Sequence, residues 1–77
     1  MKGLMPHHYN QIMLKFQLLN LPLNIEQVDY VILFMIYHNI NSIQELVDQP
    51  IDSLRQKEDW DERLEVILEI IHENHHT

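Results

Sequence analysis

The chain contains no cysteine and only one glycine, Gly3. Without cysteine it can form neither a disulfide framework nor a thiolate metal site. Without further glycines it has no glycine-rich loop of the kind that binds phosphates. Long hydrophobic runs are also missing, since the longest, Val31 to Tyr37, is far shorter than the roughly 20 residues that span a bilayer. These absences exclude a disulfide-stabilised fold, a thiolate metal site and a membrane-spanning helix, and they argue against an enzyme that binds phosphates through a glycine-rich loop.

The 77 residues are enough for one hydrophobic core and too few for two. We expect a single helical domain over residues 1–77, with flexible ends at 1–5 and 74–77, because terminal segments are poorly ordered unless they dock. Hydrophobic residues make up 45% of the chain and charged residues 22%, which is typical of a globular protein and not of a disordered one. The amino terminus lacks the features of a secretory signal, so we expect a cytoplasmic protein with no membrane contact.

Negative charge is concentrated in the second half of the chain, and the net charge is −7. In residues 1–44 two acids balance two bases, whereas ten carboxylates in residues 45–73 face only Arg55, Lys57 and Arg63. Nucleic acids are bound chiefly by lysine and arginine at their phosphates, which this half would repel. We therefore expect no direct binding to nucleic acid.

Signals for helix starts recur along the chain. Pro6 suits the first turn of one helix and Pro50 the first turn of another, short one. A polar cap followed three residues later by Glu or Gln predicts three more starts, at Asn24/Gln27, Ser42/Glu45 and Asp59/Glu62. The last helix is expected to run to about Asn74. The predicted fold class is all-α, a compact single-domain bundle of about five short helices.

Apolar spacing predicts which faces of these helices are buried. In the first helix the expected apolar face consists of Tyr9, Ile12, Met13, Phe16 and Leu19. The helix over residues 25–39 is apolar on all sides, so it must be covered all round by its own domain or by a partner chain. The most buried positions are expected to be Phe16, Ile32, Met35, Leu46, Leu64, Ile67, Leu68 and Ile71.

One pattern extends from about residue 21 to 73. It consists of Ile40, Ile43, the run Glu45-Leu46-Val47, the run Ile51-Asp52-Ser53-Leu54, and Trp60, Leu64, Ile67 and Ile71. It resembles the carboxy-terminal domain of the bacterial RNA polymerase alpha subunit, a relative of helix-hairpin-helix and SAM-like domains, and the resemblance implies a compact helical fold.

The DNA-binding residues of that family do not match this chain. The family uses an arginine early in its first helix and a glycine-lysine-lysine turn before its last. Here the first position offers Asp29 and Tyr30, and the turn offers Asp61, Glu62 and Arg63. Acidic residues occupy the positions at which the family has the basic residues that bind DNA. The resemblance therefore supports the fold and argues against DNA binding.

Histidines and serines give no firm sign of chemistry. His72 and His76 stand four residues apart with Glu69 and Glu73 alongside, a spacing that can hold zinc. We favour a solvated carboxy-terminal end instead, and predict no metal and no cofactor. The two serines are explained by a cap and a short helix, and no nucleophile with a nearby base is recognisable. The chain is therefore predicted not to be an enzyme.

Two surfaces are candidates for a protein contact. The last helix has one sector of carboxylates beside two apolar residues, formed by Glu62, Glu65, Glu69 and Glu73 with Val66 and Ile70. An apolar strip bordered by acids favours a partner with a basic surface, although an ordinary solvated face is the alternative. In the second helix, Leu33, Phe34 and Tyr37 predict a homodimer or a constitutive complex, unless neighbouring helices bury both sides.

The sequence as a whole predicts a small acidic protein–protein interaction module without catalytic activity, such as a bacterial regulatory or adaptor protein. One alternative is a nucleic-acid-related protein, either a helix-hairpin-helix binder with an unrecognised DNA-binding face or an acidic mimic of DNA. Another is a structural subunit of a phage or conjugation particle.

Overall fold

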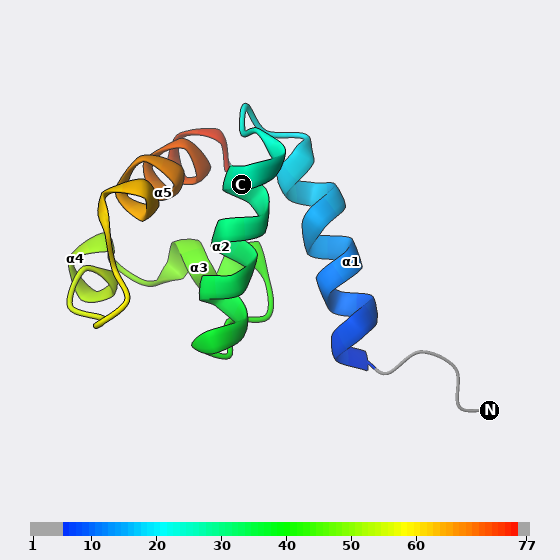
Figure 1. Ribbon diagram of the computed structural model, residues 1–77, viewed down its shortest axis with the longest axis horizontal. Helices are drawn as coiled ribbons and strands as arrows, with labels where there is room; N and C mark the ends of the chain where they lie inside the picture. The colour runs from blue at the N-terminus through cyan, green and yellow to red at the C-terminus, as the bar shows by residue number, and fades with distance from the viewer. Residues whose placement is uncertain (1–5, 76–77) are drawn as a thin grey trace.

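A computed structural model describes residues 6–75, which form five helices and no strand (Figure 1). The helices are α1 (Pro6–Leu19), α2 (Ile25–Tyr37), α3 (Ile43–Asp48), α4 (Ile51–Leu54) and α5 (Glu62–Asn74). The predicted all-α class is confirmed. The predicted flexible ends fall largely in residues 1–5 and 76–77, which lie outside the described part. Within that part, no helix is both long enough and apolar enough to cross a membrane.

α2 is the central helix of the molecule. α1 and α2 run antiparallel and form a hairpin, and α5 packs on α2 as well, on the side away from α1 (Figure 1). The short helices α3 and α4 connect α2 to α5. Because helices on two sides cover α2, part of its all-round apolar sequence is explained within the chain itself, although Ile25, Leu33, Ile36 and Tyr37 remain exposed.

The hydrophobic core joins all five helices. Its buried side chains are Leu14, Leu18, Val28, Val31, Ile32, Phe34, Met35, Ile40, Ile43, Leu46, Leu54, Leu64, Ile67, Leu68 and Ile71. Seven of the eight predicted core residues are among them, and the prediction was wrong for Phe16, which is 64% exposed. α1 instead turns Leu14 and Leu18 to the core. Since α1 has apolar residues on most of its sides, periodicity alone could not choose between its faces.

Side-chain caps start α2 and α3 where the sequence predicts them. Asn24 Oδ1 accepts a hydrogen bond from Gln27 N at 2.8 Å, and Gln27 Oε1 accepts one from Asn24 N at 2.9 Å. This is a complete capping box. Ser42 Oγ accepts from Glu45 N at 3.1 Å, but the Glu45 carboxylate accepts from Asn41 N, one residue before the expected donor.

The cap of α5 is Asp61 and not the predicted Asp59. Asp61 Oδ1 accepts from Leu64 N at 3.1 Å. The Asp59 carboxylate instead lies 2.8 Å from His38 Nε2, just after the end of α2. Both aspartates stand shortly before α5, where either could cap it. The contact with His38, 21 residues away in the sequence, engages Asp59, and Asp61 is the residue that caps the helix.

Candidate functional site

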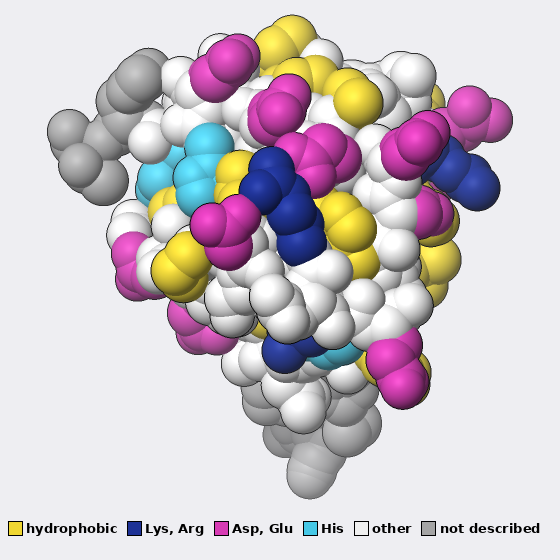
Figure 2. All heavy atoms as spheres, turned by 90° about the vertical axis from the view of Figure 1, so that its left-hand side faces the viewer, with side chains coloured by type: hydrophobic (Ala, Val, Ile, Leu, Met, Phe, Trp, Pro, Cys, Tyr) yellow, Lys and Arg dark blue, Asp and Glu magenta, His cyan; other side chains and the backbone are white. Residues whose placement is uncertain are grey.

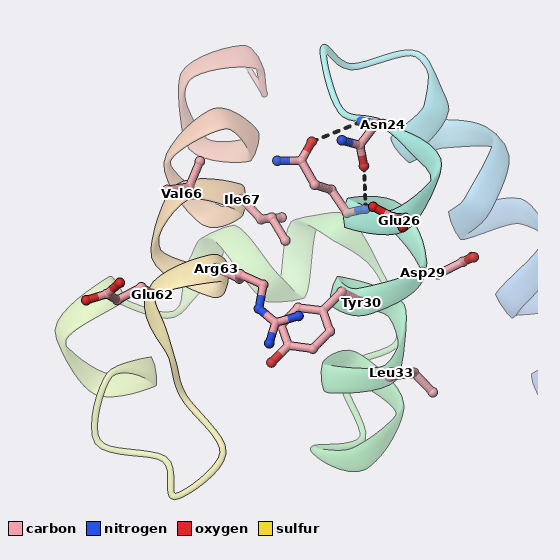
Figure 3. Close-up of a pocket in the computed structure, with 10 residues that line it drawn as sticks. Asn24, Glu26, Asp29, Tyr30, Leu33, Glu62, Arg63, Val66 and Ile67 are labelled. Atoms are coloured by element: carbon pink, nitrogen blue, oxygen red, sulfur yellow. Dashed lines mark hydrogen bonds between the residues drawn. The ribbon is translucent and has the colours of Figure 1, made fainter.

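A groove with a volume of about 710 Å³ runs between α2 and α5 (Figure 3). The residues that line it come from the first two-thirds of α2 with its cap and from the first half of α5: Asn24, Glu26, Gln27, Asp29, Tyr30, Leu33, Glu62, Arg63, Val66 and Ile67. A second hollow of about 350 Å³ shares Tyr30 and Leu33 with it and continues towards Tyr37 at the end of α2. We call the two together the α2–α5 groove.

A cluster of three polar side chains crosses the groove from α5 to α2. The hydroxyl of Tyr30 donates a hydrogen bond to Asp61 Oδ2. The guanidinium of Arg63 lies over the Tyr30 ring, 4.9 Å from its centre, and Figure 3 shows the two side chains meeting in the middle of the groove. Arg63 Nε is also 4.0 Å from Asp61 Oδ2. Since Asp61 caps α5, the cluster fixes the start of α5 against α2.

The hydrogen bond between Tyr30 and Asp61 shifts the pKa values of both groups in opposite directions. It is the main reason that the pKa of Asp61 is lowered, and the backbone hydrogen bond from Leu64 acts in the same sense. The same bond, followed by burial, raises the pKa of Tyr30. Asp61 therefore stays ionised and Tyr30 stays neutral over a wide pH range, and the ring remains available as a neutral surface for a cation.

The walls of the groove are apolar and its rim is acidic. Leu33 is 64% exposed and Val66 50% exposed, although both are large apolar side chains. Glu26, Asp29 and Glu62 line the groove as well, and in Figure 3 the side chains of Asp29 and Glu62 point outward on opposite sides. On the neighbouring face formed by α4 and α5, carboxylates are likewise interspersed with apolar patches (Figure 2). The groove thus offers apolar contacts within reach of several negative charges.

The structure separates the residues predicted on the last helix. Glu62 and Val66 line the groove. Glu65 lies on another side of α5, where its Oε1 accepts a hydrogen bond from Arg55 Nε at 2.8 Å, and this bond is the main reason that its pKa is lowered. Glu69 and Glu73 are exposed and Ile70 is half-buried, and these three do not line the α2–α5 groove.

The predicted patch on α2 is smaller than expected. Leu33 and Tyr37 are 64% and 75% exposed, whereas Phe34 is only 4% exposed and belongs to the core. The Phe34 ring packs against Trp60 at 6.1 Å and against His38 at 4.5 Å between ring centres. Phe34 is therefore not a surface residue, and the remaining exposed pair, Leu33 and Tyr37, lines the α2–α5 groove.

Sequence reasoning missed the cluster of Tyr30, Asp61 and Arg63 as a unit. The comparison with the polymerase domain placed Tyr30 in one helix and Asp61 and Arg63 in a separate turn, and nothing in the sequence indicated that they would meet. Tyr30 and Asp61 are 31 residues apart, and only the packing of α5 on α2 joins them.

The histidines show no clustered site in the described residues. No group of three or more metal-ligating side chains is found there. His72 has a buried Nε2 without a hydrogen-bond partner, and the ring of His75 lies 3.1 Å from Gln44 Oε1. His76, the second member of the predicted zinc spacing, lies outside the described residues.

Comparison with protein-family models, curated proteins and solved structures finds no match to the chain. The resemblance to the polymerase domain stays a prediction, and function is inferred from the groove.

Proposed function

We propose that the protein is a non-catalytic interaction module whose α2–α5 groove binds a basic, amphipathic segment of another protein. The observation that carries the proposal is the combination, in one groove, of exposed Leu33 and Val66 with an acidic rim. A bacterial regulatory or adaptor protein of the cytoplasm fits this activity, and the absence of cysteine suits a reducing compartment.

An amphipathic helix is the form of partner that suits the groove best. Helix-in-groove binding buries an apolar stripe in an apolar channel, with anchor residues at three- and four-residue intervals. The stripe would contact Leu33, Val66 and Tyr37, which stand exposed along the groove. Lysine or arginine at the edges of the stripe would meet Glu26 and Glu62. Charges of this kind chiefly steer the encounter and select the partner, while the apolar contacts supply most of the affinity.

Arg63 indicates how the groove would receive a partner's arginine. Its guanidinium already occupies the face of Tyr30 and remains largely exposed to solvent, so an incoming guanidinium could replace it. A contact of this type contributes about 0.5–1 kcal/mol at an exposed site. Arg63 is also the only cation among the residues that line the groove, so it opposes a basic partner until it moves aside.

The proposal is tested with a designed helical peptide that has leucines on one face and arginines at its edges. A scrambled peptide of the same composition has the same charge but no apolar stripe. We expect the first peptide to shift the backbone amide resonances of Leu33 and Val66 in an NMR titration, and the scrambled peptide to bind much more weakly. Equal affinity for both peptides would refute binding through an apolar groove.

A matched pair of variants separates the groove from net charge. Replacing Glu26 and Glu62 by glutamine should weaken binding of the helical peptide by roughly three- to tenfold, because two exposed charge contacts are lost. The double variant Glu69→Gln/Glu73→Gln has the same net charge, but its substitutions lie away from the groove, so its affinity should change little. Equal losses in the two variants would contradict the assignment of the site.

The charge distribution argues against the nucleic-acid alternative in its direct form. Lys15 Nζ lies 3.3 Å from Asp29, Arg55 Nη1 2.6 Å from Asp52 and Arg63 Nε 4.0 Å from Asp61. These cations are already paired with carboxylates, so they form no free basic patch for phosphates. We expect no gel shift of duplex DNA even at low salt. An acidic mimic of DNA would bind a protein partner and is therefore one form of the proposed module.

A further inference from the structure

The outer side of the α1–α2 hairpin is a second apolar surface, formed by apolar residues other than those of the groove. On α1, Ile12, Phe16 and Leu19 follow one another at four- and three-residue intervals and are each between 40% and 64% exposed. On α2, Ile25 and Ile36 are 62% and 43% exposed. In Figure 1 no other helix covers α1 on the side away from α2. We call these five residues the hairpin outer face.

An ion pair shows that the two helices present these residues on the same side. Lys15 Nζ of α1 lies 3.3 Å from Asp29 Oδ1 of α2, and both side chains are about half exposed, so the pair bridges the helices at their surface. At about 100° per residue, Ile25 and Ile36 lie within about 40° of Asp29 around α2. By the same geometry Ile12 and Leu19 lie within about 60° of Lys15 around α1, with Phe16 beyond them. The apolar residues therefore flank the ion pair.

The area of this face matches what a dimer requires. If a fully exposed large side chain offers roughly 200 Å², the exposed fractions of these five residues leave on the order of 500 Å² of apolar surface on each copy. A standard interface buries about 800 Å² per partner, of which about 65% is apolar in homodimers. The two estimates agree, whereas a single exposed side chain would fall far short.

The charge of this face favours a second copy over a basic partner. The chain carries a net charge of −7, so two copies repel each other over most of their surfaces. Lys15 is the only Lys or Arg in α1, which contains no Asp or Glu, and Asp29 balances it. One cation and one carboxylate also make the face self-complementary, because a two-fold axis can bring the Lys15 of each copy near the partner's Asp29.

We propose that a second copy of this chain packs on the hairpin outer face, so that two α1–α2 hairpins form a four-helix bundle around a two-fold axis. The surface differs from the Leu33, Phe34 and Tyr37 patch predicted from the sequence. It also rests on different apolar residues from the proposed function, because none of the five residues of the hairpin outer face lines the α2–α5 groove and only Asp29 borders both surfaces.

Sedimentation equilibrium of the full chain over a wide concentration range tests the proposal. We expect a mass that rises to twice the 9.4 kDa of the chain. Phe16→Glu should raise the dimer dissociation constant at least tenfold while circular dichroism shows unchanged helicity. Val66→Glu adds the same charge at an apolar residue of similar exposure in the groove, and should leave the dimer intact. A monomer at all concentrations overturns the proposal, as does a dimer broken by Val66→Glu and not by Phe16→Glu.

Opposite charge changes at the ion pair test the two-fold arrangement. Lys15→Glu leaves only acids at the centre of the face, and Asp29→Lys leaves only bases, so each variant alone should be monomeric. An equimolar mixture should form a dimer that contains one copy of each, as mass spectrometry under native conditions would show. A mixture that stays monomeric overturns the proposal. Because neither readout involves a peptide, failure here is distinguishable from failure of the groove.

Discussion

The burial pattern of α5 allows a stability prediction with its control on the same helix. Leu68 is fully buried and Ile71 is fully buried one turn later, whereas Val66 is 50% exposed. Truncation of a buried leucine to alanine costs about 2–5 kcal/mol, since it removes apolar contacts and leaves a cavity. A chain of this length is stabilised by roughly 4–12 kcal/mol in total. Leu68→Ala is therefore expected to remove a large part of the free energy of unfolding.

Milder substitutions keep the comparison measurable. Ile71→Val removes one buried methylene and should lower the free energy of unfolding by about 0.5–1.5 kcal/mol, or the melting temperature by roughly 2–12 °C. Val66→Ala removes exposed carbon atoms, and alanine favours the helix by up to about 0.7 kcal/mol. Its melting temperature should stay within a few degrees of the wild type or rise slightly.

Thermal and urea unfolding followed by circular dichroism measure these changes. All proteins should be compared at one low concentration, because dimer formation makes the melting temperature depend on concentration. If Val66→Ala destabilised the chain as much as Ile71→Val, α5 would have to be rotated about its axis relative to α2. That result would refute both the core and the groove described above.

Three further predictions concern the groove cluster and the histidines. Arg63→Ala should strengthen binding of the basic helical peptide two- to fivefold by calorimetry, while Lys57→Ala, with the same charge change outside the groove, should not. Because the pKa of Asp61 is lowered, its stabilising contribution is complete above the unfolded pKa of about 4 and is lost as the pH falls through the lowered value. The urea midpoint of the wild type should therefore fall towards pH 2, and it should fall less in Asp61→Asn. The pKa of Tyr30 is raised, so its contribution holds below about pH 10 and is lost above, a dependence that Tyr30→Phe should remove. Zinc in modest excess should leave the melting temperature unchanged, and an increase abolished by His72→Ala would contradict this.

The helices could be predicted from the sequence because their boundaries are set locally. Asn24 and Ser42 act through atoms three residues away, and a proline at position 50 precedes α4 directly. The buried side of α5 was also predictable, since Leu64, Ile67, Leu68 and Ile71 share one side of the helix and the acids lie on other sides. Caps and helical periodicity act within a few residues, so they can be recognised without knowing what the helix packs against.

Buried helix faces and helix caps that depend on contacts between distant residues could not be predicted from the sequence. Phe34 is buried because Trp60, from the loop before α5, packs against its ring, and no periodicity in α2 reveals that. Phe16 was misplaced because α1 is apolar on most sides. Asp59 was mistaken for a cap because its partner, His38, is 21 residues away. The groove needs the packing of α5 on α2, so Leu33, Tyr37, Glu62 and Val66 could be predicted singly as contact residues, but not as one site.

α2 contributes residues to both candidate binding surfaces of the molecule. Tyr30, Leu33 and Tyr37 face the groove shared with α5, and Ile25 and Ile36 face outward beside α1. A dimer built on the outer face would carry two open grooves in a fixed relative position. A partner with two basic segments could then occupy both, and the second contact would form at the high effective concentration that a short linker provides. A weak groove on so small a chain would in this way become a strong binding site, without any further contact within one copy.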